Sequence, residues 1–232
     1  MGVKRTPGRY IIQENSRVEV ISKVRALKTT ISSRGPGLEA CLQLPGETGP
    51  FPGVVLCHPH PLYGGNMDNN IILSVSKSLS GRGIASLRFN FRGVGNSKGQ
   101  FGNGLGEKED ALAALEYLAG HEAIDKGRIG IAGYSFGGMV AMGAGSQSSA
   151  VRAIAAISPV IDPGVLKSCT KPKFIVCGSK DHIVNTAAVE REVAAMADPK
   201  DIEIIPGADH FWYELEEMVA SRVMNFFADI LI

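Results

Sequence analysis

Two five-residue stretches of this 232-residue sequence place a serine between two glycines in the pattern G-x-S-x-G, GYSFG at 133–137 and GNSKG at 95–99. A serine in this pattern attacks a carbonyl carbon, and the glycines relieve the crowding of a sharp strand-to-helix turn. The chain holds 28 glycines, so the pattern also arises by chance. The elements around each serine must therefore decide between the two.

Ser135 is favoured because a buried strand precedes it and a helix follows it. The run RIGIAG at 128–133 reads as a buried strand, and FGGMVAMGAGS at 136–146 is compatible with a helix. A helix starting there directs N–H groups and the positive end of its dipole at the serine. Ser97 lies in a glycine-rich stretch, 92–106, without a helix directly after it, which favours a flexible or turn serine.

A serine hydroxyl needs a base, because it is hardly nucleophilic at neutral pH. Only two histidines follow Ser135 in the chain, His182 and His210. His210 lies in a loop after the last predicted strand, at the sheet edge where ligands bind in parallel sheets. We therefore expect His210 to be the base and His182 to be a loop residue near the pocket.

The base needs an acid that fixes its tautomer and stabilises the imidazolium. Asp181 ends the apolar run KFIVCGSKD, so its carboxylate should project from the same sheet edge as His210. Asp162, which follows an earlier strand, is the second candidate. Asp209 is adjacent to His210 and cannot easily reach its ring.

The elements that position these residues alternate between strand and helix along most of the chain. We expect strands at 17–30, 38–44, 53–59, 84–91, 128–133, 151–160, 173–179 and 201–207, and helices at 67–80, 107–120, 136–146, 186–197 and 212–230. Alternation of this kind indicates βαβ crossovers and a mainly parallel sheet. The turn RGPG at 34–37 predicts a hairpin that adds antiparallel strands at one edge. No long linker appears, so we expect a single domain over 1–232.

Several segments together resemble one superfamily, and they are HPHPLYGGNMDNN at 58–70, FNFRGVGNSKGQF at 89–101, GYSFGG at 133–138, GSKD at 178–181 and GADHFW at 207–212. Across nearly its full length the chain resembles an α/β-hydrolase. It is similar to small serine hydrolases of the dienelactone-hydrolase and acyl-peptidase-like branch. The resemblance implies a mostly parallel, twisted sheet with helices on both faces, antiparallel strands at the N-terminal edge and no cap domain. Dienelactone hydrolases proper use a cysteine nucleophile, whereas Ser135 stands here.

Acyl transfer requires two donors for the oxyanion of the tetrahedral intermediate. One is expected from the backbone N–H of Phe136, the residue after the nucleophile. The other should come from the segment HPHPLYGG at 58–65, whose two prolines have no N–H. The candidates, in order, are the N–H of His60, the N–H of Leu62 and the Tyr63 hydroxyl.

The substrate site should be shallow, because the gap in which this superfamily usually inserts a lid spans only 161–172. This favours small or short-acyl esters over long-chain lipids. The side chains that we expect to line the acyl and alcohol sides are Leu62, Tyr63, Phe136, Val184, Phe211 and Trp212.

We expect no metal and no cofactor. His58 and His60 lack a third ligand nearby, and His58 fits structural hydrogen bonds better. The glycine-rich stretch 92–106 lacks the G-x-x-x-x-G-K-[ST] phosphate-binding pattern. The four cysteines form no C-x-x-C pair. We interpret the charged residues around this stretch as loop-bracing ion pairs and helix caps. These residues are Asp68, Arg88, Arg92 and Asp110.

Net charge and composition limit the classes of partner that we expect this protein to bind. The formal net charge of +1 gives no electrostatic reason for binding nucleic acid or an anionic membrane. The N-terminus has no apolar stretch long enough for a signal peptide, so we expect a cytoplasmic protein. The partner should be a small-molecule ester. The apolar end FFADILI at 226–232 faces either the core or a second copy in a possible homodimer.

These observations predict a carboxylesterase-like serine hydrolase that forms an acyl-enzyme. A peptidase, thioesterase or acyltransferase with the same three residues is the main alternative. A non-catalytic ligand-binding protein on a hydrolase fold is an alternative from another class, because a fold does not by itself imply a function.

Overall fold

One sheet of eight strands organises the computed structural model, which describes residues 24–32, 35 and 37–232. Its strands are β1 (Arg25–Ile31), β2 (Leu38–Leu44), β3 (Phe51–Cys57), β4 (Ala85–Phe89), β5 (Ile124–Tyr134), β6 (Val151–Ile157), β7 (Lys173–Gly178) and β8 (Lys200–Ile205). The helices are the short 3-10 helix η1 (Pro61–Tyr63), α1 (Asn70–Gly81), α2 (Leu105–Gly120), α3 (Phe136–Gln147), α4 (Thr186–Ala195) and α5 (Glu216–Leu231).

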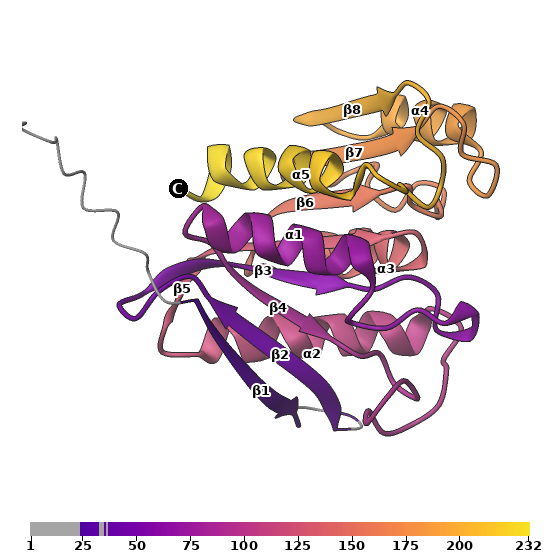
Figure 1. Cartoon of the computed structure of the whole chain (residues 1–232). Helices are drawn as coiled ribbons and strands as arrows, with labels where there is room; N and C mark the ends of the chain where they lie inside the picture. The colour runs from indigo at the N-terminus through magenta and orange to yellow at the C-terminus, as the bar shows by residue number, and fades with distance from the viewer. Residues whose placement is uncertain (1–23, 33–34, 36) are drawn as a thin grey trace, which may run out of the picture.

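The strands lie in the order β1-β2-β4-β3-β5-β6-β7-β8 (Figure 1). From β4 to β8 all neighbours pair in parallel, while β2 pairs antiparallel with both β1 and β4. The predicted mostly parallel sheet with an antiparallel N-terminal edge is therefore confirmed. The beginning of the predicted first strand, residues 17–23, lies outside the described residues.

Helices cover both faces of the sheet, as predicted. Helices α1 and α5 lie side by side on one face (Figure 1), where their apolar residues share a core with the sheet. Helices α2, α3 and α4 contribute to a second core on the opposite face. Phe227 and Leu231 of α5 are buried in the first core, so the C-terminal apolar segment packs mainly inward. No helix in the part of the chain that the structure describes is long and apolar enough to cross a membrane.

Strand β6 and helix α5 are among the elements that are shorter than the sequence predicts, and the same backbone feature shortens both. Strand β6 ends at Ile157 instead of residue 160, because Ser158 has a φ of 39°. Helix α5 begins at Glu216 instead of residue 212, because Trp212 and Glu214 have φ values of 58° and 63°. A positive φ fits neither a strand nor a right-handed helix. Hydrophobic patterning does not reveal such a backbone reversal.

The connection between β6 and β7 contains turns but neither strand nor helix over 158–172. It therefore forms no cap over the carboxyl ends of the strands, as predicted. Two lysines fix the position of this connection. Lys171 donates to carbonyls at the end of α3. Buried Lys173 donates to the carbonyls of Cys169 and Ala197.

His58 joins the end of β3 to the segment after β4. Its Nε2 accepts a 3.0 Å hydrogen bond from the Phe91 N–H, so the proton is on Nδ1, which donates to the Pro59 carbonyl at 2.7 Å. Burial lowers the pKa of His58 to about 4, although the bond to Pro59 opposes this effect. His58 is thus a neutral structural residue, as expected from its place at a strand end.

The neutral state of His58 predicts a loss of stability in mild acid. The unfolded chain protonates this imidazole near pH 6.5, but the folded chain does so only near pH 4. Between these values the unfolded state binds more protons, so the free energy of unfolding falls as the pH drops, by about 2 kcal/mol at pH 5. Urea titrations at neutral pH and at pH 5 measure the loss. It should be smaller in His58→Gln, and equal losses in the two proteins would contradict a buried neutral imidazole.

Candidate active site

Ser135 occupies a strained turn between β5 and α3, with φ 56° and ψ −120°. A positive φ is uncommon outside glycine and is found where the surrounding structure enforces it. Here the Ser135 N–H donates to the Ile157 carbonyl at 2.9 Å, and the Ser135 carbonyl accepts from Gly138 at 2.9 Å and from Val160 at 3.2 Å. The turn is therefore held by the neighbouring strand and by its own helix.

The two glycines of GYSFG are required by close backbone approach. A Cβ on Gly133 would overlap the Gly137 carbonyl, and a Cβ on Gly137 would overlap the carbonyls of Cys57 and His58. The first turn of α3 thus lies directly against the end of β3. These close approaches are the physical reason for glycine at both ends of the G-x-S-x-G pattern around Ser135.

Ser97 of the second match has a different role. It is buried, its hydroxyl donates to the Asn90 carbonyl at 2.7 Å, and it accepts from the Glu39 N–H at 2.9 Å. Ser97 therefore fastens the segment after β4 to the neighbouring strand β2. Ser97 is therefore a structural turn serine, as one of the two expectations had it. The other expectation, a flexible serine, is wrong, because its hydroxyl both donates and accepts a hydrogen bond.

The glycine-rich segment after β4 is braced by ion pairs, as the sequence suggested. Arg92 lies 2.8 Å from the Asp110 carboxylate, which also accepts the Arg92 backbone N–H at 2.9 Å. A separate ion pair joins Arg88 of β4 to Asp68, which lies just before α1.

Ser135, His210 and Asp181 meet at the carboxyl ends of β5, β8 and β7. His210 Nε2 lies 3.0 Å from Ser135 Oγ, and His210 Nδ1 lies 2.8 Å from Asp181 Oδ2. The carboxylate can only accept, so Nδ1 of the neutral ring carries the proton and Nε2 is free to accept one from the serine. This arrangement is suited to proton transfer from the hydroxyl. The structure therefore brings together all three residues predicted from the sequence.

Asp181 is held by backbone donors as well as by His210. Its Oδ1 accepts from the N–H groups of Ile183 at 2.9 Å and Val184 at 2.8 Å. Burial acts to raise the pKa of this carboxyl, but the hydrogen bonds from His210 and Val184 outweigh burial and hold its pKa below the usual value. Asp181 is thus an ionised group aligned with the imidazole, and it can stabilise a protonated His210.

The alternative acids and base lie elsewhere. Asp162 lines a separate hollow on the surface, away from the His210 ring. Asp209 Oδ1 accepts from the N–H groups of Phe211 at 2.9 Å and Trp212 at 3.0 Å, so it shapes the turn after His210. The exposed His182 does not line the cleft that contains Ser135.

The loop that carries His210 is anchored by two aromatic residues. The Tyr134 hydroxyl donates to the His210 carbonyl at 2.7 Å, and Trp212 Nε1 donates to Ser158 Oγ at 3.2 Å. Trp212 is fully buried and does not line the cleft, so the prediction that it lines the substrate site is wrong. Sequence reasoning missed Tyr134, although this polar aromatic residue at the end of an apolar strand needs a hydrogen-bond partner when buried.

Two backbone donors are available beside Ser135. The N–H of Phe136 lies in the first turn of α3, where helical N–H groups have no intrahelical acceptor. Within the described segment 59–65, the N–H groups of residues 62–65 donate to partners in the same segment. The Leu62 N–H is directed to His60 Nδ1 at 3.2 Å, so the proposal of Leu62 as an oxyanion donor is wrong. Of that segment, only the His60 N–H has no protein acceptor, which keeps His60 as the candidate.

A cleft of about 530 Å³ opens in front of Ser135 and His210. It is lined by Pro59, His60, Tyr63, Gly64, Gly65, Asn69, Tyr134, Ser135, Ile183, His210 and Phe211. Tyr63 and Phe211 therefore lie where the sequence suggested. Val184 does not, because its side chain lines a neighbouring hollow. Asn69 and Ile183 were missed, since nothing in their local pattern shows that their loops meet.

The space around two glycines predicts opposite effects for their substitution by alanine. Gly137→Ala should lower the free energy of unfolding by about 3 kcal/mol, because the backbone carbonyls of β3 cannot move aside. Gly120→Ala, at the end of α2, meets open space and should raise it by about 0.5–1 kcal/mol. Urea denaturation measures both. A Gly137→Ala protein as stable as the wild type would refute the close approach.

The comparisons with known proteins agree with the fold. A protein of Rickettsia prowazekii, described as uncharacterized, is 39% identical over 186 residues, which cover 75% of this chain and 77% of that protein. A solved serine hydrolase homologue from Coxiella burnetii is 29% identical with a TM-score of 0.77, covering 89% of this chain and 98% of that one. A lidless α/β serine hydrolase from Xanthomonas campestris is 25% identical with a TM-score of 0.76, covering 88% and 93%.

The family match covers the central part of the chain. Residues 35–166, more than half of the chain, match the X-Pro dipeptidyl-peptidase (S15) family. This range contains Ser135 and the candidate oxyanion donors His60 and Phe136, but neither Asp181 nor His210. With the lidless fold and the serine-hydrolase relatives, this match identifies the chain as a serine hydrolase of the α/β-hydrolase superfamily that belongs to the X-Pro dipeptidyl-peptidase (S15) family.

Proposed function

We propose that this serine hydrolase cleaves carboxylic esters through an acyl-enzyme on Ser135. His210 is the general base and acid, and Asp181 orients it. The observation that carries the proposal is the hydrogen bonding of the His210 ring at both nitrogens, 3.0 Å from Ser135 Oγ and 2.8 Å from Asp181 Oδ2. A nucleophile and base at hydrogen-bond distance, with the base oriented by a third group, are what acyl transfer requires.

In the first half-reaction, Ser135 Oγ attacks the ester carbonyl carbon while His210 Nε2 takes the hydroxyl proton. The resulting oxyanion accepts hydrogen bonds from the N–H groups of Phe136 and His60, and Asp181 stabilises the imidazolium. The tetrahedral intermediate collapses as His210 returns the proton to the leaving alcohol oxygen. Ser135 is then acylated and His210 is neutral again.

In the second half-reaction, water replaces the alcohol. His210 Nε2 takes a proton from the water, whose oxygen attacks the acyl carbon, and the same two N–H groups stabilise the new oxyanion. Collapse breaks the bond to Ser135 Oγ, which recovers its proton from His210 as the carboxylic acid leaves. The open cleft, with no cap formed by the 158–172 connection, supports access of water to this step.

The family match favours a second candidate, hydrolysis of a peptide bond by the same three residues. An ester demands less of the catalyst, because an alkoxide leaves more readily than an amide nitrogen. Two substrates with the same acyl and aryl groups, p-nitrophenyl acetate and p-nitroacetanilide, separate the candidates. We expect turnover of the ester only, and anilide turnover that depends on Ser135 would favour the peptidase.

The two G-x-S-x-G serines should respond in opposite ways to alanine. Ser135→Ala should lower kcat for p-nitrophenyl acetate by about 10⁴-fold or more and leave the fold intact. Ser97→Ala should retain activity but lose about 1–3 kcal/mol of stability, because the Glu39 N–H and the Asn90 carbonyl lose their partner. Steady-state kinetics and urea denaturation test the pair. Activity that survives in Ser135→Ala would eliminate the proposed nucleophile.

The two candidate acids can be separated in the same way. Asp181→Asn should reduce kcat by about 10³–10⁴-fold with little change in KM, because the amide no longer holds the Nδ1–H tautomer of His210. Asp162→Asn should leave kcat unchanged, since Asp162 lines a different hollow. If both variants had wild-type kcat, His210 would need another partner.

A further inference from the structure

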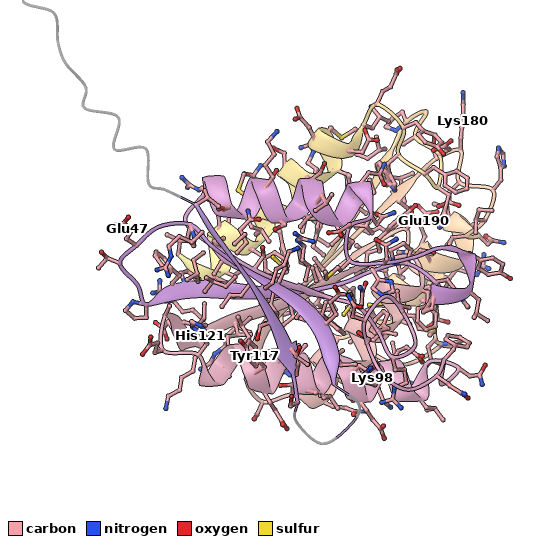
Figure 2. All side chains as sticks on the ribbon, turned by 60° about the horizontal axis from the view of Figure 1, so that its bottom comes forward. Glu47, Lys98, Tyr117, His121, Lys180 and Glu190 are labelled. Carbon is pink, nitrogen blue, oxygen red and sulfur yellow. The ribbon has the colours of Figure 1, made fainter. Side chains whose placement is uncertain are left out.

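The cleft in front of Ser135 carries no charged side chain. Its lining, all within the described residues, contains no Asp, Glu, Lys or Arg. Three carboxylates lie close to the lining in sequence. Asp181 bonds to His210 and two N–H groups, and Asp209 bonds to two N–H groups of its own turn. Asp68, which precedes Asn69, is paired with Arg88. Figure 2 shows the side chain of Lys180, the neighbour of Asp181, pointing away from the molecule. No side chain of the lining therefore offers a counter-charge to a charged substrate group.

Helix N-termini add to this electrostatic environment. The cleft lining includes Ser135 and Asn69, which are the N-cap residues of α3 and α1. The N-terminus of a helix carries a partial positive charge. This partial charge favours an oxyanion and disfavours a cation. A cation entering the cleft also loses hydration without gaining a charged partner in the lining.

Asn69 presents an uncharged donor in the cleft wall. Its Oδ1 accepts from the Ile71 N–H at 3.0 Å as the cap of α1, so the orientation of the amide is defined. Its Nδ2 has no acceptor among the described residues and can donate to a substrate oxygen. Because Asp is as good an N-cap as Asn, this position could carry a carboxylate without loss of the helix.

Release of an X-Pro dipeptide requires a different environment. The substrate of that reaction has a free α-amino group on the residue before the proline, and this group has a pKa of about 8, so it is mostly protonated at neutral pH. The ammonium lies on the acyl side, close to the scissile carbonyl. The family match also ends before Ile183 and Phe211, so it does not cover the opposite wall of the cleft.

We propose that the cleft selects esters with an uncharged acyl group, that Asn69 sets this selectivity, and that the chain does not release X-Pro dipeptides. The proposal rests on the ester hydrolysis proposed above and names its substrate class. The acyl group fits against apolar surface from Ile183 and Phe211, while Asn69 Nδ2 donates to an oxygen of the substrate.

A pair of isosteric esters tests the role of charge. The p-nitrophenyl esters of 5,5-dimethylhexanoate and 4-(trimethylammonio)butanoate differ in replacement of a quaternary carbon by a quaternary nitrogen. The rate of each with hydroxide corrects for intrinsic reactivity. We expect a corrected kcat/KM at least about 10-fold higher for the neutral ester. A corrected ratio near one, or one that favours the cation, overturns the proposal.

Asn69→Asp tests the assigned residue. It keeps the cap of α1 but replaces the free donor by a carboxylate, so the ratio should shift by about 10-fold towards the cationic ester. Any change in chemistry common to both esters cancels in the ratio. Asn185→Asp is the matched control, because Asn185 is the N-cap of α4 and lies outside the cleft. An equal shift in both variants would mean that Asn69 does not set the selectivity.

Ser135 labelling by a fluorophosphonate separates this proposal from the proposed function. An unlabelled Ser135 and absence of Ser135-dependent ester turnover would refute the esterase itself. A labelled Ser135 with equal use of the two esters would refute only the selectivity. Ala-Pro-p-nitroanilide, which carries the free ammonium, should not be cleaved, and Ser135-dependent cleavage would overturn the proposal.

Discussion

The close approach of the first turn of α3 to the end of β3 constrains the whole candidate site. The Gly137 backbone lies so near the Cys57 and His58 carbonyls that a single methyl group would not fit. This contact forces the chain to reverse at Ser135 with a positive φ, which raises the hydroxyl above the sheet edge and points the N-terminus of α3 at the same place. The adjoining His58 is kept neutral by burial, and its two hydrogen bonds join the end of β3 to the segment after β4.

The loop that carries His210, the proposed base, is held by contacts of its own. Strand β8 delivers His210, but its position depends on Tyr134 from the strand before the serine and on the buried Trp212, which bonds to Ser158. The residue before the serine thus holds the backbone of the proposed base. Asp181 is aligned by its own backbone donors before it meets the imidazole. Each of the three residues is therefore held by contacts that do not involve the other two, which is the preorganisation that acyl transfer needs.

The match to a peptidase family is consistent with an uncharged cleft, because the match covers only one part of the site. The matched residues, 35–166, contain Ser135 and the candidate oxyanion donors His60 and Phe136, which would serve acyl transfer to any leaving group. The acid, the base and the wall formed by Ile183 and Phe211 lie beyond them. The family match thus covers the proposed nucleophile, while the proposed acyl-binding wall lies outside it. An uncharged cleft on this shared machinery supports an ester substrate.

The sequence by itself determined the elements and the three central residues, because the cues are local. A buried strand, a serine between glycines and a helix are read within about fifteen residues, and Asp181 and His210 each follow a strand of the same parallel sheet. Only the tertiary structure decided which side chains face the cleft. Trp212 is buried and bonds to Ser158, the Leu62 N–H is directed to the His60 ring, and Asn69 and Ile183 line the same cleft from distant loops. The direction of a side chain in a loop depends on backbone torsions and long-range contacts, which hydrophobic periodicity does not encode.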